Sequence, residues 1–117
     1  MPETIMFSDF RLGDSWFTAM DSADPRHAFG FNEAVSLVVR CADQAEVDRL
    51  WQALSAVPEA EQCGWLKDRF GVSWQIVPAA MDTMLSQGTP EQVDRVVQAF
   101  MPMHKIDLAT LEAAYAG

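Results

Sequence analysis

The chain has 117 residues, a mass of 13.0 kDa and a formal net charge of −9, and 50% of its residues are hydrophobic. This length suits one domain with a modest core, and the hydrophobic content is typical of a folded globule. An acidic surface repels phosphate backbones and anionic lipid, so we expect neither nucleic acid nor a membrane as a partner. The sequence shows no signal peptide and no long apolar run, which predicts a cytoplasmic protein with reduced thiols.

The first residues predict a β-hairpin. An apolar-rich strand is expected over residues 3–12, Gly13 and Asp14 form a turn, and residues 15–20 return as the second strand. The polar, turn-rich run of residues 21–27 is expected to be a loop that connects two parts of the chain.

A strand and a helix are expected next. Residues 34–41 are rich in β-branched side chains, which favour a strand. Asp43 and Glu46 have the spacing of a capping box at the start of a helix. The apolar stripe that follows predicts a helix packed against a sheet, and it consists of Val47, Leu50, Trp51 and Leu54.

The run of residues 63–78, CGWLKDRFGVSWQIVP, predicts a second hairpin. Gly71 can supply the positive φ that a tight turn requires. The second arm alternates between two faces, with Val72, Trp74 and Ile76 on one and Ser73, Gln75 and Val77 on the other.

Helices are expected over the rest of the chain. One covers residues 79–87 and ends at Gly88. The next begins after a Thr89 cap, with proline at the first helical position and glutamine at the third. Asp107 is expected to cap a last short helix.

The run of residues 63–78 resembles the PhnB-like family, which also carries the name 3-demethylubiquinone-9 3-methyltransferase. That family is part of the vicinal-oxygen-chelate superfamily of glyoxalases, bleomycin-resistance proteins and dioxygenases. The resemblance covers nearly all of the chain and implies an α+β fold. In that fold a curved sheet of βαβββ modules forms a cup, with helices on its outer face; here a helical C-terminal tail follows.

The resemblance divides a single domain, residues 1–117, into three parts. Residues 1–21 are expected to be the hairpin remnant of a first module, residues 28–78 the second module, and residues 79–117 the C-terminal helices. The pattern Gly-x-Ser-Trp at residues 13–16 and 71–74 agrees with two related modules, and both tryptophans are expected to pack under helices.

The first module is incomplete under this interpretation, since its opening strand and helix are absent. Either the chain starts inside a longer gene product, or the protein completes its sheet in another way. An unpaired strand edge promotes association. We therefore expect a homodimer in which sheets or swapped segments replace the missing part.

The resemblance also indicates where a site would lie. Metal-dependent members carry their ligands on strands that face the cup. Alternation puts Ser36, Val38 and Arg40 on that face together with Ser73, Gln75 and Val77. The position that resembles the last-strand glutamate ligand is Gln75, and the first-strand ligand position resembles Ser36.

Neither Gln75 nor Ser36 is a good ligand for a divalent ion, because both side chains are neutral. The two histidines, His27 and His104, stand on separate elements and form no metal motif. We therefore predict no metal and no cofactor, with a divalent metal as the alternative. Trp65 shares a face with Cys63 and Lys67, and it is expected either to pack in the core or to line a pocket or a dimer contact.

Three functional hypotheses follow. The first is a protein that binds a small molecule in the cup, through Ser36, Arg40, Trp65, Ser73 and Gln75. The second is a metal-dependent isomerase, lyase or dioxygenase with ligands shared across a dimer. The third is a structural dimerisation module. The sequence assigns no reaction, and its six scattered glycines form no Gly-x-Gly motif that would support S-adenosylmethionine-dependent methyl transfer.

Overall fold

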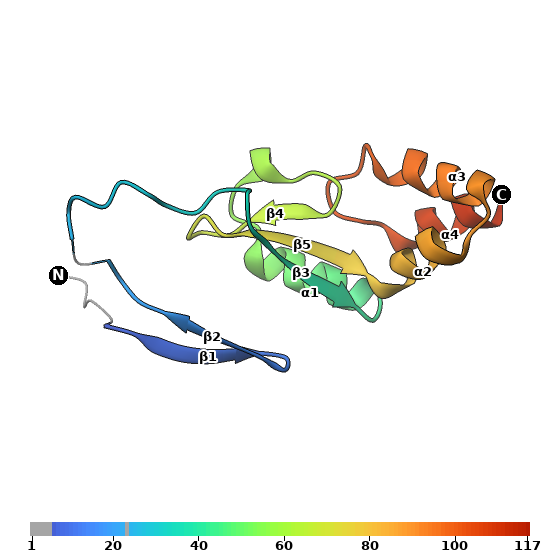
Figure 1. Cartoon of the computed structure of the whole chain (residues 1–117). Coiled ribbons are helices and arrows are strands. Elements are labelled where there is room, and N and C mark those ends of the chain that lie inside the picture. The colour runs from blue at the N-terminus through green and yellow to red at the C-terminus, as the bar shows by residue number, and fades with distance from the viewer. Residues whose placement is uncertain (1–5, 23) are drawn as a thin grey trace. The chain divides into compact units, whose positions relative to one another are not determined.

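The computed structural model describes residues 6–22 and 24–117, and the chain forms two compact units, residues 1–30 and 31–117 (Figure 1). The second unit is α+β, with a small mixed sheet, and the first is built on a hairpin. No helix within the described residues has the length and apolar content needed to cross a membrane.

The first unit holds an antiparallel hairpin of β1 (Ser8–Leu12) and β2 (Ser15–Ala19). The predicted turn is confirmed, and Gly13 adopts a φ of 59° there. The first strand begins at Ser8 because its pairing partner is Ala19, the last residue of β2. Residues 6 and 7 therefore precede the strand, and the predicted strand residues 3–5 lie outside the described residues.

The prediction that Trp16 packs under a helix is wrong within this unit. The residue is 69% exposed, on a strand that pairs only with the other arm of the hairpin among the described residues. The guanidinium carbon of Arg11, its cross-strand neighbour, lies 5.9 Å from the indole centroid. The repeated Gly-x-Ser-Trp pattern therefore places its two tryptophans in different surroundings.

The sheet of the second unit has the order β3-β5-β4. Strand β3 (Ser36–Cys41) runs parallel to β5 (Ser73–Pro78), and β4 (Trp65–Lys67) pairs with β5 in the antiparallel sense. This confirms the predicted second hairpin, and Gly71 has the positive φ, 88°, expected of it.

Helix α1 (Gln44–Leu54) covers one face of this sheet, and a 3-10 turn, η1 (Pro58–Ala60), follows it. Asp43 caps the helix by accepting a hydrogen bond from the Glu46 backbone at 2.9 Å. The buried cluster under α1 comprises Cys41, Val47, Trp51, Leu66 and Ile76, with Val39 and Trp74 packed against it. The predicted alternation of β5 is thus confirmed on its helix-covered side.

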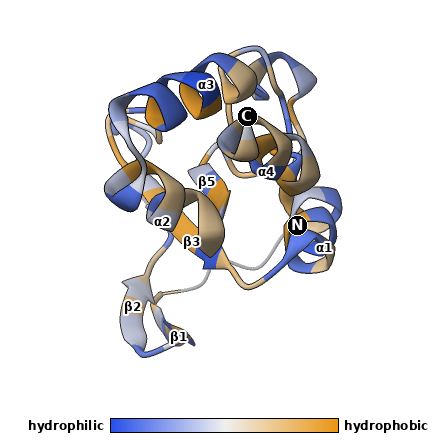
Figure 2. Cartoon of the chain, turned by 90° about the vertical axis from the view of Figure 1, so that its right-hand side faces the viewer, coloured by the Kyte–Doolittle hydropathy of each residue, from blue (hydrophilic) through white to orange (hydrophobic). Residues whose placement is uncertain are grey.

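Three helices, α2 (Ala79–Gln87), α3 (Pro90–Phe100) and α4 (Leu108–Ala116), gather where β5 ends (Figure 1). Their hydrophobic residues form a second buried cluster, and β3 and β5 appear as hydrophobic ribbons beside it in Figure 2. The predicted Thr89–Gln92 capping box is present in both directions, at 2.9 and 3.2 Å.

Gly88 ends α2 as predicted, but its φ is −71°, which any residue can adopt. Close packing is what requires glycine there. A Cβ atom at this position would lie 2.7 Å from the Met84 carbonyl oxygen and 3.0 Å from the Tyr115 ring.

Candidate functional site

One face of the sheet in the second unit, opposite the face that α1 covers, carries the predicted pocket residues. The strand register aligns Ser36 with Ser73, Val38 with Gln75, and Trp65 with Gln75. Residues aligned across neighbouring strands share a face. We call this the polar face, and it consists of Ser36, Val38, Arg40, Ser73, Gln75, Val77, Trp65 and Lys67.

The centre of the polar face is a neutral hydrogen-bonded pair. The Gln75 side-chain amide donates to Ser36 Oγ at 2.9 Å, across the two parallel strands. Ser73, the neighbour of Gln75 on the same face of β5, is 2% exposed, whereas Val38 is 44% exposed. The structure therefore brings together Ser36 and Gln75, the two residues that the resemblance puts at ligand positions, and they are hydrogen-bonded to each other.

A positively charged side chain lies toward each end of the polar face, and each forms an ion pair with a carboxylate. Arg40 binds Asp82 on α2, at the end where the helices gather. Lys67 binds Glu33, which precedes β3. Hydrogen bonding from Lys67 lowers the pKa of the Glu33 carboxyl below its usual value, so this group is ionised at neutral pH.

Glu33 is a residue that the sequence analysis did not identify. It belongs to an irregular segment, so no strand or helix periodicity marks it. The alternation of Cys63, Trp65 and Lys67 does place Lys67 on the polar face, but the sequence holds no signal for the carboxylate that reaches it.

A shallow hollow of about 390 Å³ borders the polar face. Its lining consists of Glu33, Ala60, Gln62, Cys63 and Trp65. Trp65 belongs both to the hollow and to the polar face, where it aligns with Gln75. This indole therefore joins the predicted pocket residues to the cavity beside them.

The polar face does not fit a divalent metal ion. Ser36 and Gln75 supply one hydroxyl and one amide, which carry no charge and are engaged with each other. Across residues 6–22 and 24–117, no group of three or more His, Cys, Asp or Glu side chains is placed to hold such an ion. We derive no metal-dependent step.

The two cysteines differ in their surroundings. Cys41 is fully buried, and this burial raises the pKa of its thiol to about 11, so it is a poor nucleophile. Cys63 is half-buried, and its thiol donates to the Met101 carbonyl oxygen at 2.9 Å. That contact belongs to the attachment of the α3–α4 loop, which also includes a 2.8 Å contact from His104 Nδ1 to the Glu61 carbonyl oxygen.

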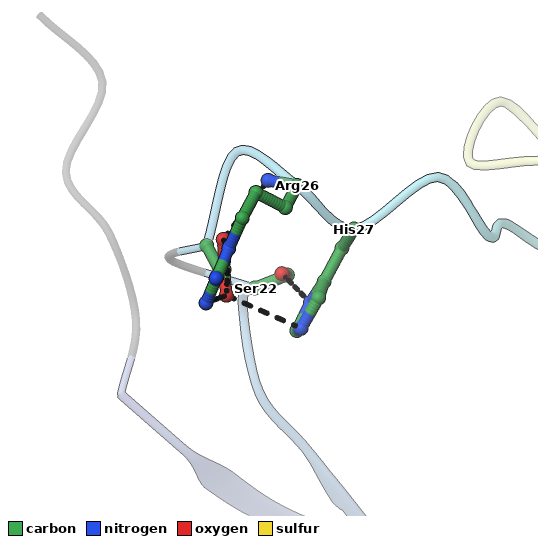
Figure 3. A network of polar contacts seen from close by, with 4 residues as sticks. Ser22, Arg26 and His27 are labelled. Carbon is green, nitrogen blue, oxygen red and sulfur yellow. Dashed lines mark hydrogen bonds and ion pairs between the residues drawn. The ribbon is translucent and has the colours of Figure 1, made fainter.

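A second group of polar residues lies in the loop of the first unit (Figure 3). Ser22 Oγ contacts His27 Nδ1, and His27 Nε2 lies 3.9 Å from Asp24 Oδ2. These are the residue types of a hydrolase triad, but Arg26 binds Asp24 in place of the histidine, at 2.7 Å from Oδ2. A triad needs its carboxylate to orient the histidine. We therefore interpret these contacts as stabilising the conformation of the turn.

The family model described as 3-demethylubiquinone-9 3-methyltransferase matches residues 1–77, which is well over half of the chain. The match covers the hairpin of the first unit, β3, α1 and the strands of the polar face except the last residue of β5. No curated protein matches this sequence.

Proposed function

This chain belongs to the 3-demethylubiquinone-9 3-methyltransferase domain family, a glyoxalase-like family of the vicinal-oxygen-chelate superfamily, and we propose that it binds a small organic molecule on the polar face. The observation that carries the proposal is the shared register of Ser36, Ser73, Gln75 and Trp65 beside a hollow. Small-molecule sites combine an apolar or aromatic surface with a few convergent polar groups.

Each residue has a distinct role in this proposal. The indole of Trp65 supplies a flat apolar surface, while Gln75 and Ser36 supply a hydrogen-bonding pair that can exchange its internal bond for one to a ligand. Arg40 lies at the helical end of the face, where its guanidinium binds Asp82, and it marks the limit of the site. We assign no reaction to these groups, and no Gly-x-Gly motif for a cofactor occurs in the sequence.

We propose further that the binding form is a homodimer. The hairpin of the first unit is amphipathic, because its register gathers Phe10, Leu12, Phe17 and Ala19 on one face. A two-stranded hairpin is marginally stable by itself, and β3 forms one edge of the sheet of the second unit. A second copy can cover such faces and edges by symmetric pairing.

The binding proposal is tested by a thermal-shift screen of small organic molecules against the wild-type chain and Gln75→Leu. A ligand at about 100 times its Kd adds about 2.7 kcal/mol to the free energy of unfolding. For a domain of this size that raises Tm by on the order of 10 °C. The shift should be lost in Gln75→Leu and in Ser36→Ala. It should persist in the matched control Gln98→Leu, whose glutamine is exposed on α3.

Equal shifts in Gln75→Leu and Gln98→Leu would reject the polar face as the site. The dimer is tested separately by multi-angle light scattering. A strictly monomeric species at high protein concentration would contradict it, whatever the outcome of the ligand screen.

A further inference from the structure

The hollow beside Trp65 is lined by one acidic residue together with aromatic, amide and small side chains. The lining side chains are one carboxylate, one indole, one amide and two small apolar or weakly polar side chains: Glu33, Trp65, Gln62, Ala60 and Cys63. Its volume of about 390 Å³ lies within the usual range of ligand pockets, about 300–1,000 Å³. No basic residue lines it. Among the described residues that line it, the only full charge is the Glu33 carboxylate, whose partner Lys67 lies outside the lining.

The carboxylate of Glu33 is ionised and accessible. Lys67 keeps the pKa of this carboxyl below its usual value, and the Glu33 side chain is 65% exposed. The Lys67 side chain is 24% exposed, so the positive member of the pair is the more covered one. A positively charged ligand can thus approach the carboxylate from the solvent side.

Trp65 adds a second feature that favours a cation. Tryptophan has the side chain whose ring face attracts cations most strongly, and an ammonium over an indole gains from this attraction most when both are partly desolvated. Trp65 is half-buried, so its indole is already partly desolvated. The net charge of −9 also raises the local concentration of cations near the protein.

We infer that this hollow binds the charged end of an organic cation, an ammonium group carried on a small apolar body. The ammonium approaches Glu33 and the face of Trp65, and the remainder of the molecule extends toward Gln75 and Ser36. The inference rests on the proposed function, because Trp65 is common to the hollow and the polar face. It adds the chemical class of the ligand.

Substitutions of the two members of the Glu33–Lys67 ion pair should have opposite effects on the binding of a cation. Glu33→Gln removes the negative charge from the hollow and should weaken the binding of a cation. Lys67→Met keeps the length of the side chain but removes the competing ammonium, which leaves Glu33 without its partner. That substitution should strengthen binding. A purely structural role of the pair would not produce effects of opposite sign.

The test compares choline with 3,3-dimethylbutan-1-ol, which has nearly the same shape and no charge. Each is titrated into the 15N-labelled full chain, and the indole N–H resonance of Trp65 is followed by NMR. We expect saturable binding of choline that is about tenfold tighter than that of the alcohol. Glu33→Gln should abolish this preference, and Lys67→Met should increase it. The matched control Glu112→Gln, on an exposed position of α4, should leave it unchanged.

Three results would overturn the inference: equal affinity for choline and the alcohol, equal behaviour of Glu33→Gln and Glu112→Gln, or no response of the Trp65 indole to choline. If any of them occurs while Gln75→Leu still abolishes binding of a compound from the thermal-shift screen, the cation class fails and the proposed function stands. If Gln75→Leu has no effect on any ligand, the proposed function itself fails.

Discussion

Asp68 organises the turn that aligns Trp65 with Gln75, and replacing it should cost more than its surface location suggests. Its Oδ1 accepts hydrogen bonds from the backbones of Phe70 and Val72 at 2.9 and 3.0 Å. Its Oδ2 accepts from the indole nitrogen of Trp74 at 2.9 Å. One carboxylate thus satisfies three donors, two of them in the β4–β5 turn.

The expected magnitude of Asp68→Ala follows from these contacts. A hydrogen bond contributes about 0.5–1.5 kcal/mol net, and somewhat more when the acceptor is charged. Three bonds at a partly exposed position therefore give a loss of about 2–3 kcal/mol in the free energy of unfolding. Asp68→Asn should lose about half as much, because its remaining oxygen still accepts from the turn backbone while its NH2 group opposes the Trp74 donor.

Urea unfolding followed by circular dichroism measures both losses. Asp94→Ala is the matched control, since Asp94 is exposed on α3, and it should change the free energy of unfolding by no more than about 0.5 kcal/mol. A loss below about 0.5 kcal/mol for Asp68→Ala would refute the role assigned to this carboxylate. So would equal losses for the alanine and asparagine variants.

Three further predictions concern other parts of the chain. The pKa of the Glu33 carboxyl in the folded protein is lowered from 4.5. The ionised carboxylate therefore adds stability above that pH, and this stability is lost as the pH falls through the lower folded-state pKa. Glu33→Gln should remove this part of the acid sensitivity, measured by unfolding at a series of pH values. Gly88→Ala should destabilise by about 1–3 kcal/mol in urea unfolding because its Cβ meets the Met84 carbonyl, whereas Gly30→Ala, with nothing within 4 Å, should be near neutral; similar values would contradict this packing. Iodoacetamide at pH 8 should leave Cys41 unmodified in mass spectra under conditions that alkylate a fully exposed thiol, and rapid alkylation would contradict its raised pKa.

The helices whose first residues are set by a capping side chain could be predicted from the sequence. Thr89 and Asp107 begin helices at the predicted residues because a cap acts within one turn of its own position. The alternation of β5 predicted that Gln75 shares a face with Ser36, because period two is set by the backbone itself. This agreement accounts for the predicted pocket residues lying on one face.

The remaining features depended on contacts that no periodic pattern of the sequence encodes. Glu33 reaches Lys67 from an irregular segment, and Asp68 binds Trp74 around a turn, so neither contact has a periodic signature. Trp16 shows the opposite failure: the repeated motif suggested burial under a helix, but its hairpin offers the side chain no such cover within its unit. A local pattern fixes a residue's face, and the surrounding elements determine what covers that face.

The helices that follow β5 restrict where a ligand can bind. Val77 and Arg40 align on the two parallel strands, but Val77 is buried in the cluster formed with α2, α3 and α4, and Arg40 is tied to Asp82 of α2. That end of the polar face is therefore occupied by the chain's own side chains. The accessible part is the rest of the face, around Gln75 and Trp65, and the hollow lies beside it there. Because the ionised group lining that hollow is the Glu33 carboxylate, a ligand that binds there meets a carboxylate and the indole of Trp65.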